Sequence, residues 1–247
     1  MSLAFGGLQA VDRVSFQVAP GAVRAVIGPN GAGKTTLFHL VTGFLTPQSG
    51  RIRFQGQEIQ GQPPYLIARR GIARTFQLTQ LFDHMSVLEN VMVGRHRLSR
   101  AGLLAGALQL PWTRVEEQGI RAKAMEALEF VGLASRAHQP AAALPLGLKR
   151  LLEIARALAA APTLLLLDEP ASGLDALETD RLREMILTLR DQGLTTLLVE
   201  HDMGLTMEVA DAIAVLNYGQ LIADGPPRAI QKNPEVIAAY LGTDWQT

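Results

Sequence analysis

Apolar runs along the chain predict a set of buried strands. Val23–Ile27 and Leu164–Leu167 are short and almost wholly apolar, which is typical of strands that are covered on both faces of a parallel sheet. Thr195–Val199 is another strand, and Gly71–Gln77 is a shorter one that ends in a polar residue. Because helical segments alternate with these strands along the chain, the pattern predicts an α/β fold.

Other segments alternate between apolar and polar residues, which predicts strands with one buried face. Val11–Val18 places its apolar side chains on one side, and Arg51–Phe54 alternates in the same way. Ala212–Asn217 and Gln220–Ala223 flank a Tyr-Gly turn and predict a hairpin. The chain is therefore expected to open with an antiparallel β region that precedes most of the parallel sheet.

Helical spacing dominates the middle of the chain, over residues 78–160. Ser86–Glu89 is a capping box that begins a helix, and Val115–Val131 has a helical pattern that a Gly ends. Lys149–Ala160 is a further helix with an inward apolar face. Two more helices are predicted, over Asp175–Arg190 and Pro234–Leu241. The pattern indicates a mainly helical block that is inserted into an α/β chain.

Composition narrows the class of protein. The sequence is 48% hydrophobic, and its 23 basic residues balance its 23 acidic residues, so charge gives no case for nucleic acid as the main partner. The absence of cysteine excludes disulfides and thiolate metal sites. The sequence has no secretory signal pattern, and no apolar run approaches the length that spans a bilayer. We expect a soluble chain whose role at a membrane would go through a partner.

A glycine-rich motif follows the first apolar strand and precedes a helix. It matches the phosphate-binding pattern Gly, four residues, Gly-Lys-Thr. An ordinary glycine-rich turn is the alternative, but the strand–loop–helix context favours a nucleotide site. The residues expected to bind the phosphates are Gly28, Pro29, Asn30, Gly31, Ala32, Gly33, Lys34, Thr35 and Thr36. Lys34 would place its charge near the outer phosphates, and the Thr35 hydroxyl would bind Mg²⁺.

Polar residues stand at the ends of several predicted strands, where open parallel sheets bind ligands. They are Gln77, Asp168, Glu169 and His201. Asp168 would hold the magnesium ion, and Glu169 would accept a proton from an attacking water. Gln77 would contact the metal or the water, and His201 would donate to the γ-phosphate. A single histidine at a strand end is more often structural, but together with the phosphate loop the set favours phosphoryl transfer from a bound nucleotide to water.

The order of motifs GPNGAGKTT, TFQ, LLLLDEP, SGLD and VEHD resembles the ATP-binding subunit of an ABC transporter. The resemblance implies a P-loop NTPase (RecA-like) core with an N-terminal antiparallel β subdomain and an inserted α-helical subdomain. It assigns Walker A to 28–36, the Q-loop to Gln77, Walker B to 164–169 and the D-loop to 172–175. It makes His201 the switch histidine and places Phe5 where the family stacks an aromatic ring on adenine. We expect one domain over 1–247, with the core in 1–77 and 161–247 and the helical subdomain in 78–160.

Within that family, the helical insertion, the LLEIARAL helix and the ending 233–242 are similar to the LivG-type subunit of branched-chain amino acid importers. Importers for urea and short amides, and the lipopolysaccharide-export ATPase, share some of these endings. The resemblance implies ATP and Mg²⁺ as cofactors, a second ABC ATPase subunit, polytopic permease subunits and, indirectly, a periplasmic or extracellular binding protein. It implies a peripheral position on the cytoplasmic face of the membrane. The cargo is chosen by subunits that are not in this sequence.

Two departures from the family pattern bear on these expectations. The signature sequence is Leu144-Pro-Leu-Gly147-Leu instead of Leu-Ser-Gly-Gly-Gln, so a Ser hydroxyl and a backbone N–H are lost. In this family a signature closes over the partner's nucleotide, so we hypothesise a heterodimer with unequal sites, in which Gly147 contacts that nucleotide. The alternative is that Gly147 and the helix N-terminus bind well enough alone. The family also has a further strand before Phe5, so either the start is misassigned or that edge strand is missing.

Two other functions remain open at this stage. One is a regulatory or degenerate subunit that binds ATP and dimerises but hydrolyses it poorly. The other is a soluble ABC-type ATPase without a transporter, as in DNA repair or translation. Such proteins usually carry paired cassettes or long coiled-coil insertions, and this chain has a single short cassette.

Overall fold

A six-stranded sheet forms the centre of the protein, with strand order β10-β9-β3-β8-β7-β6. The computed structural model describes residues 1–76, 80–96 and 111–241. The strands are β3 (Val23–Ile27), β6 (Ile72–Arg74), β7 (Leu164–Asp168), β8 (Thr195–Val199), β9 (Ala212–Asn217) and β10 (Gln220–Gly225). All neighbours run parallel except β9 and β10, which form an antiparallel hairpin. The predicted α/β fold is confirmed.

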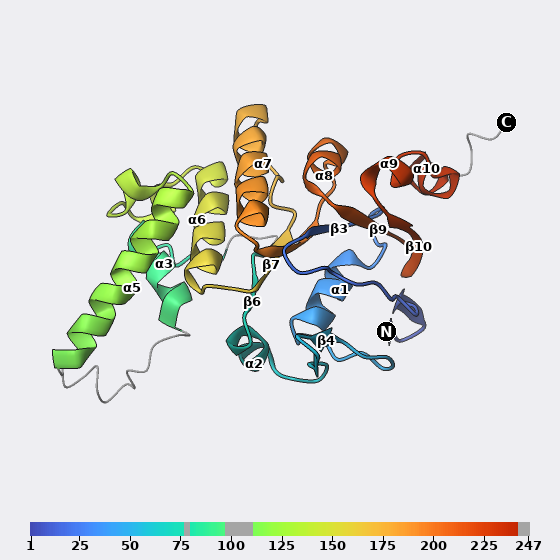
Figure 1. Cartoon of the computed structure of the whole chain (residues 1–247), viewed down its shortest axis with the longest axis horizontal. Helices are drawn as coiled ribbons and strands as arrows, with labels where there is room; N and C mark the ends of the chain where they lie inside the picture. The colour runs from blue at the N-terminus through green and yellow to red at the C-terminus, as the bar shows by residue number, and fades with distance from the viewer. Residues whose placement is uncertain (77–79, 97–110, 242–247) are drawn as a thin grey trace.

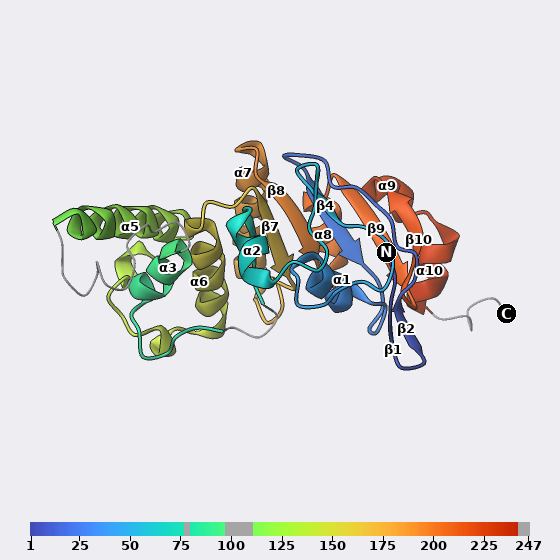
Figure 2. The same cartoon turned by 90° about the horizontal axis from the view of Figure 1, so that it is seen from below.

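Helices cover both faces of this sheet (Figures 1 and 2). On one face lies α1 (Lys34–Val41); on the other lie α7 (Ala176–Asp191), α8 (Met203–Val209), α9 (Pro227–Ile230) and α10 (Pro234–Leu241). Successive side chains of a strand point to opposite faces, so Leu166 packs in the same cluster as α1, and Leu165 in the same cluster as α7. The continuous apolar run in β7 is explained by this double covering.

The remaining helices form a lobe at one end of the molecule (Figures 1 and 2). It contains α3 (Val87–Arg95), α5 (Pro111–Phe130) and α6 (Leu146–Ala159), which contact one another. Ser86 and Glu89 form the predicted capping box, and Gly132 follows α5 with a φ of 75°. Helix α6 begins three residues earlier than predicted, because Pro145 occupies its N-cap position and fixes φ at −57°. We call this group of helices the helical lobe.

Short antiparallel hairpins precede the lobe: β1 (Leu3–Phe5) with β2 (Leu8–Val11), and β4 (Arg53–Phe54) with β5 (Gln57–Glu58). Helix α2 (Pro64–Arg69) follows them. The predicted strand over Val11–Val18 is wrong. Arg13 has a φ of 49°, which ends β2, and the next amide donates to the Met1 carbonyl. The side chains after Arg13 still alternate between more buried and exposed, and this alternation explains the apolar–polar pattern that predicted a strand.

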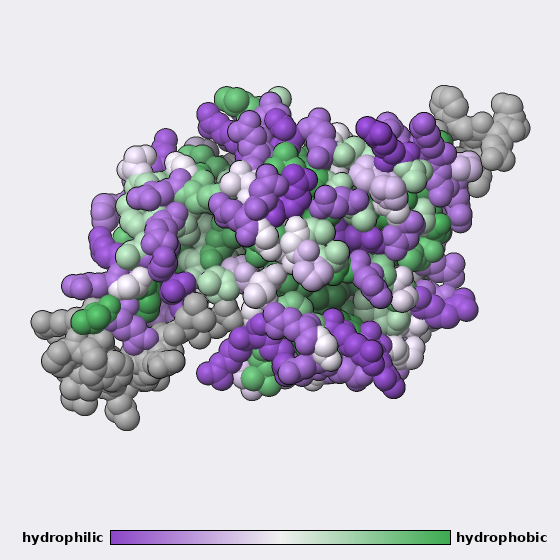
Figure 3. All heavy atoms as spheres, viewed as in Figure 1, coloured by the Kyte–Doolittle hydropathy of each residue, from purple (hydrophilic) through white to green (hydrophobic). Residues whose placement is uncertain are grey.

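The exterior is mixed in character. The face seen in Figure 3 is largely hydrophilic, with smaller hydrophobic areas between the polar side chains. Among the described residues, no helix combines the length and the hydrophobicity needed to cross a bilayer.

Candidate nucleotide site

The glycine-rich loop joins β3 to α1 and has backbone angles that require glycine. Gly28 has a φ of 151°, and a Cβ atom built there would lie 2.1 Å from the backbone oxygen of Leu216. Gly33 has a φ of 101°, and a Cβ there would lie 2.3 Å from the backbone oxygen of Ala10. Neighbouring chain segments therefore press directly against the loop. The first turn of α1 begins at Lys34, so free amides at its start face the loop.

Lys34 is buried and bonded within the loop. Its Nζ donates to the carbonyl of Gly28 at 2.7 Å and to that of Pro29 at 3.0 Å. Burial lowers the pKa of Lys34, while the nearby carboxylates of Glu169 and Asp168 act in the opposite direction. Thr35 follows with an exposed side chain. The structure thus brings the loop lysine close to the two acidic residues at the end of β7.

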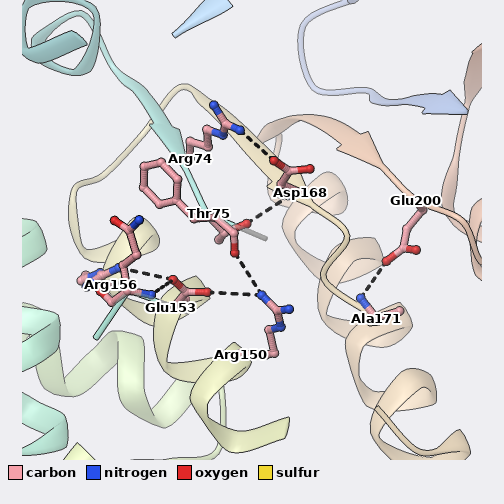
Figure 4. A network of polar contacts seen from close by, with 10 residues as sticks. Arg74, Thr75, Arg150, Glu153, Arg156, Asp168, Ala171 and Glu200 are labelled. Atoms are coloured by element: carbon pink, nitrogen blue, oxygen red, sulfur yellow. Dashed lines mark hydrogen bonds and ion pairs between the residues drawn. The ribbon is translucent and has the colours of Figure 1, made fainter. Parts of the chain in front are cut away.

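Asp168 ends β7 and is almost completely buried. Its Oδ2 forms an ion pair with Nη2 of Arg74 at 2.7 Å, and the two side chains are 2% and 6% exposed (Figure 4). Its backbone N–H donates to the Thr75 hydroxyl at 3.2 Å. Oδ1 is buried and has no hydrogen-bond partner among the described residues. A buried carboxylate oxygen of this kind is available to a further ligand.

Glu169 follows with a strained backbone and a histidine partner. Its φ is 48°, an uncommon angle for a residue with a Cβ, and such strain costs roughly 1–3 kcal/mol. Oε1 lies 2.7 Å from Nε2 of His201, which follows β8. The amide of Glu169 donates to the carbonyl of Val199 at the end of β8. The ends of two neighbouring strands therefore place a carboxylate and an imidazole in direct contact.

Glu200 was not singled out from the sequence, yet it organises this region. It is 2% exposed, and its Oε1 accepts from the amide of Ala171 at 2.7 Å (Figure 4). Its Oε2 accepts from the amide of His201 at 2.8 Å. Burial raises the pKa of Glu200, while these backbone bonds act against that rise. The carboxylate joins the turn after Glu169 to the segment that carries His201. Its position in the VEHD motif could have identified it as a site residue from the sequence.

Gln77 lies outside the described residues, but the chain on either side is held by α6. Arg150 donates to the carbonyl of Phe76 at 3.0 Å, and Glu153 accepts from the amide of Gln80 at 3.0 Å (Figure 4). Arg156 donates to the carbonyl of Gln80 at 2.5 Å. Glu153 is 2% exposed, and burial raises its pKa. Sequence reasoning treated α6 as an apolar face and missed these charged residues.

Gly147 and Phe5 were also predicted to contact a nucleotide, and they lie on other elements than the phosphate loop and β7. Gly147 is the second residue of α6, and a Cβ there would lie 2.3 Å from Oε1 of Glu178 on α7. A side chain at this position would therefore displace the Glu178 carboxylate, which is the end of a flexible side chain. Phe5 ends β1 and is 49% exposed.

The donor set near the loop is compatible with Mg²⁺. That ion prefers oxygen ligands and usually binds one or two carboxylates together with substrate phosphates. Asp168 offers a free buried oxygen, and Thr35 offers a hydroxyl at the start of α1. Within residues 1–76, 80–96 and 111–241, no group of three or more His, Cys, Asp or Glu residues is placed to hold a metal. In a site with one or two carboxylates, Mg²⁺ usually takes its remaining ligands from substrate phosphates and water.

Two family models match the chain. The ABC transporter model matches residues 11–172, and the model for branched-chain amino acid ATP-binding cassette transporters matches residues 220–245. The chain therefore belongs to the ATP-binding cassette family of ABC transporters. As a member of this family it binds ATP and hydrolyses it.

The particular relatives agree with this family. The chain is 46% identical over 243 residues to the high-affinity branched-chain amino acid transport ATP-binding protein BraF of Pseudomonas aeruginosa. It is 44% identical to LivG of Escherichia coli K12; each match covers 98% of this chain and 95% of the relative. A nucleotide-free ATP-binding cassette from an ABC transporter has a TM-score of 0.85 at 33% identity, covering 98% of this chain and 96% of its own. The predicted resemblance is confirmed.

Proposed function

We propose that this chain is the ATP-hydrolysing subunit of an importer for branched-chain amino acids. The observation that carries the proposal is the Glu169–His201 contact of 2.7 Å beside the buried Lys34, in a chain whose relatives are named for that transport. The match of residues 220–245 to the branched-chain family model supports the cargo. Importers of urea or short amides and the lipopolysaccharide-export ATPase are the alternatives for cargo.

Each residue of the site has a role in the proposed reaction. The loop amides of 28–36 and the Lys34 ammonium bind the phosphates, and Thr35 and Asp168 hold Mg²⁺, which neutralises phosphate charge. Glu169 accepts a proton from the attacking water. With its proton on Nε2, His201 donates to Glu169 and orients that carboxylate, and it can turn toward the γ-phosphate. Gln77 completes the set as a ligand of the metal or the water.

The proposed assembly contains two ATPase subunits and membrane subunits. Its nucleotides lie between the ATPase subunits, so Gly147 at the start of α6 faces the nucleotide of the partner. Pro145 at the N-cap supplies neither a hydroxyl nor a backbone N–H to donate to a phosphate, which weakens the partner's site more than this chain's own. We therefore propose a heterodimer with unequal sites, bound peripherally on the cytoplasmic face through permease subunits. A homodimer, or a regulatory subunit with weak turnover, is the alternative.

We expect hydrolysis to require a partner subunit. The measurement is the rate of ATP hydrolysis by the purified chain alone, and by the chain mixed with the proposed partner ATPase subunit. Activity that appears only in the mixture supports the heterodimer. Pro145→Ser restores the family residue, and it is expected to raise the activity of the chain alone. Equal rates for the chain alone and for the mixture would show that the Pro145 signature is competent.

The cargo is tested by uptake. Cells that lack this chain are expected to lose ATP-dependent uptake of labelled leucine, isoleucine and valine, and a plasmid that encodes the chain is expected to restore it. Labelled urea serves as the competing cargo. Loss of urea uptake with normal leucine uptake would show that the cargo is urea and not branched-chain amino acids. The conclusion about ATP hydrolysis would not be affected.

A further inference from the structure

We propose that Arg74 is a positioning residue for the metal ion of this site: it holds one oxygen of Asp168 so that the other is presented to Mg²⁺. The inference rests on the proposed role of Asp168 as a magnesium ligand. Arg74 lies three residues before Gln77, and the sequence reading assigned it only to a short strand.

The first observation is that the two oxygens of the Asp168 carboxylate have different surroundings. Oδ2 is paired with Nη2 of Arg74 at 2.7 Å, whereas Oδ1 is buried without a hydrogen-bond partner in the described part of the chain (Figure 4). Arg74 is on β6 and Asp168 on its neighbour β7, so the pair is fixed by sheet register. A carboxylate bound on one side can turn only with the loss of a charge-assisted bond. The free oxygen therefore has a defined direction.

The second observation is that the guanidinium is itself fixed. Nη1 of Arg74 donates to the Thr42 hydroxyl at 3.2 Å, and that hydroxyl donates to the Phe38 carbonyl at 2.6 Å. The rings of Phe38 and Phe76 lie 5.4 Å and 5.2 Å from the guanidinium carbon, within the range of cation–π contact. Phe38 and Thr42 belong to α1 and its C-cap. Because α1 also carries Thr35, Arg74 sets Asp168 relative to the second proposed metal ligand.

The geometry is specific to arginine. One guanidinium spans Asp168 and Thr42 with two different nitrogens, and a lysine ammonium is a point charge that cannot reproduce this planar fork. Partners that orient a metal ligand in this way commonly affect metal affinity about 10- to 100-fold when they are removed. A purely structural ion pair would affect stability instead.

The protein supplies a matched control on another strand pair. Arg24 on β3 is buried, pairs with Asp224 on β10 at 2.5 Å, and lies 5.2 Å from the ring of Phe16. Its ion pair resembles that of Arg74, but its partner lies on the antiparallel edge strand and is 39% exposed, whereas Asp168 is 2% exposed. Arg24→Lys should cost less stability than Arg74→Lys, because its carboxylate partner is more exposed, and only Arg74→Lys should alter metal binding.

The experiment measures metal affinity directly. The chain is saturated with a non-hydrolysable ATP analogue, and Mn²⁺ is titrated as a paramagnetic substitute for Mg²⁺, with bound ion measured by electron paramagnetic resonance. We expect the Kd for Mn²⁺ to rise about tenfold or more in Arg74→Lys and to stay unchanged in Arg24→Lys. Nucleotide affinity in EDTA should be unchanged in both. An unchanged or lower Kd for Mn²⁺ in folded Arg74→Lys overturns the proposal.

Two further variants keep the result decisive. Thr42→Val removes the second hydrogen-bond partner of Arg74 with little change of shape. It should raise the Kd for Mn²⁺ by a smaller factor than Arg74→Lys does. If Arg74→Lys does not fold, an unchanged Kd in Thr42→Val overturns the proposal. Asp168→Asn tests the underlying function. If Asp168→Asn leaves the Kd unchanged, the proposed metal ligand is wrong; if it weakens binding while Arg74→Lys and Thr42→Val do not, only the role of Arg74 fails.

Discussion

Replacement of Glu169 by Gln is expected to lower the rate of ATP hydrolysis by about 100- to 10,000-fold, while the chain still binds ATP. Gln has nearly the same shape, but it cannot accept a proton from water at neutral pH. The side chain of Glu169 is 12% exposed and bonded to His201, which gives it a fixed position for the proposed role as base. Lys34 and the loop amides are untouched, which is why binding should persist.

The matched control for this change is Glu184→Gln, on α7. The Glu184 side chain is 73% exposed, so it loses the same charge away from the phosphate loop. Hydrolysis is measured as phosphate release by the active assembly, and binding with a fluorescent ATP analogue. Hydrolysis by the Glu169 variant at more than a tenth of the normal rate would show that another group accepts the proton.

Gly28→Ala is expected to lower the free energy of unfolding by about 3 kcal/mol or more and to abolish ATP binding. The new Cβ would lie 2.1 Å from a backbone oxygen of β9, and neither segment can move without disturbing the sheet. The strained φ of 151° adds a second cost. Both costs fall on the turn that presents the loop amides to the phosphates.

Gly31→Ala is the control in the same loop. Gly31 also has a positive φ, of 80°, but nothing lies within 4 Å of the position of its Cβ. Only the backbone strain remains, about 1–2 kcal/mol. Denaturant unfolding measures both variants, and nucleotide binding is measured on whichever remains folded. Equal losses in the two variants would contradict the contact between Gly28 and β9.

The sequence predicted elements well where local signals and tertiary packing agree. Thr195–Val199 and Ala212–Asn217 have the predicted bounds, and Asp175 caps α7 as expected. The strand predicted over Val11–Val18 was wrong for two reasons. Side chains can alternate between buried and exposed in a segment that has no hydrogen-bonded neighbouring strand. The positive φ of Arg13 also could not be predicted, because an arginine seldom adopts it. The start of α6 was missed because a proline at the N-cap does not resemble the usual polar cap.

The positions of the site residues were predictable from the sequence, whereas their supporting contacts were less so. Lys34, Asp168, Glu169 and His201 stand at loop and strand ends, and the topology of a parallel sheet brings such positions together. Arg74 could not be predicted in the same way, because its partner Asp168 is 94 residues away and their pairing depends on which strands are neighbours. Glu200 was missed although it lies in the VEHD motif, because its partners are backbone amides, which a sequence does not distinguish.

The hydrogen bonds of Thr75 and Phe76 mark a boundary between the core and the helical lobe. Thr75 is bonded to β7, whereas the carbonyl of the next residue, Phe76, is bonded to Arg150 of α6, so adjacent residues contact the core and the helical lobe. The chain returns to the core between the end of α6 and the start of β7, where Ala161 has a φ of 47°. A rigid-body rotation of the lobe would therefore turn about two hinges, one at 75–76 and one near 161, and would carry Gly147 with it while leaving Lys34 and Asp168 in place.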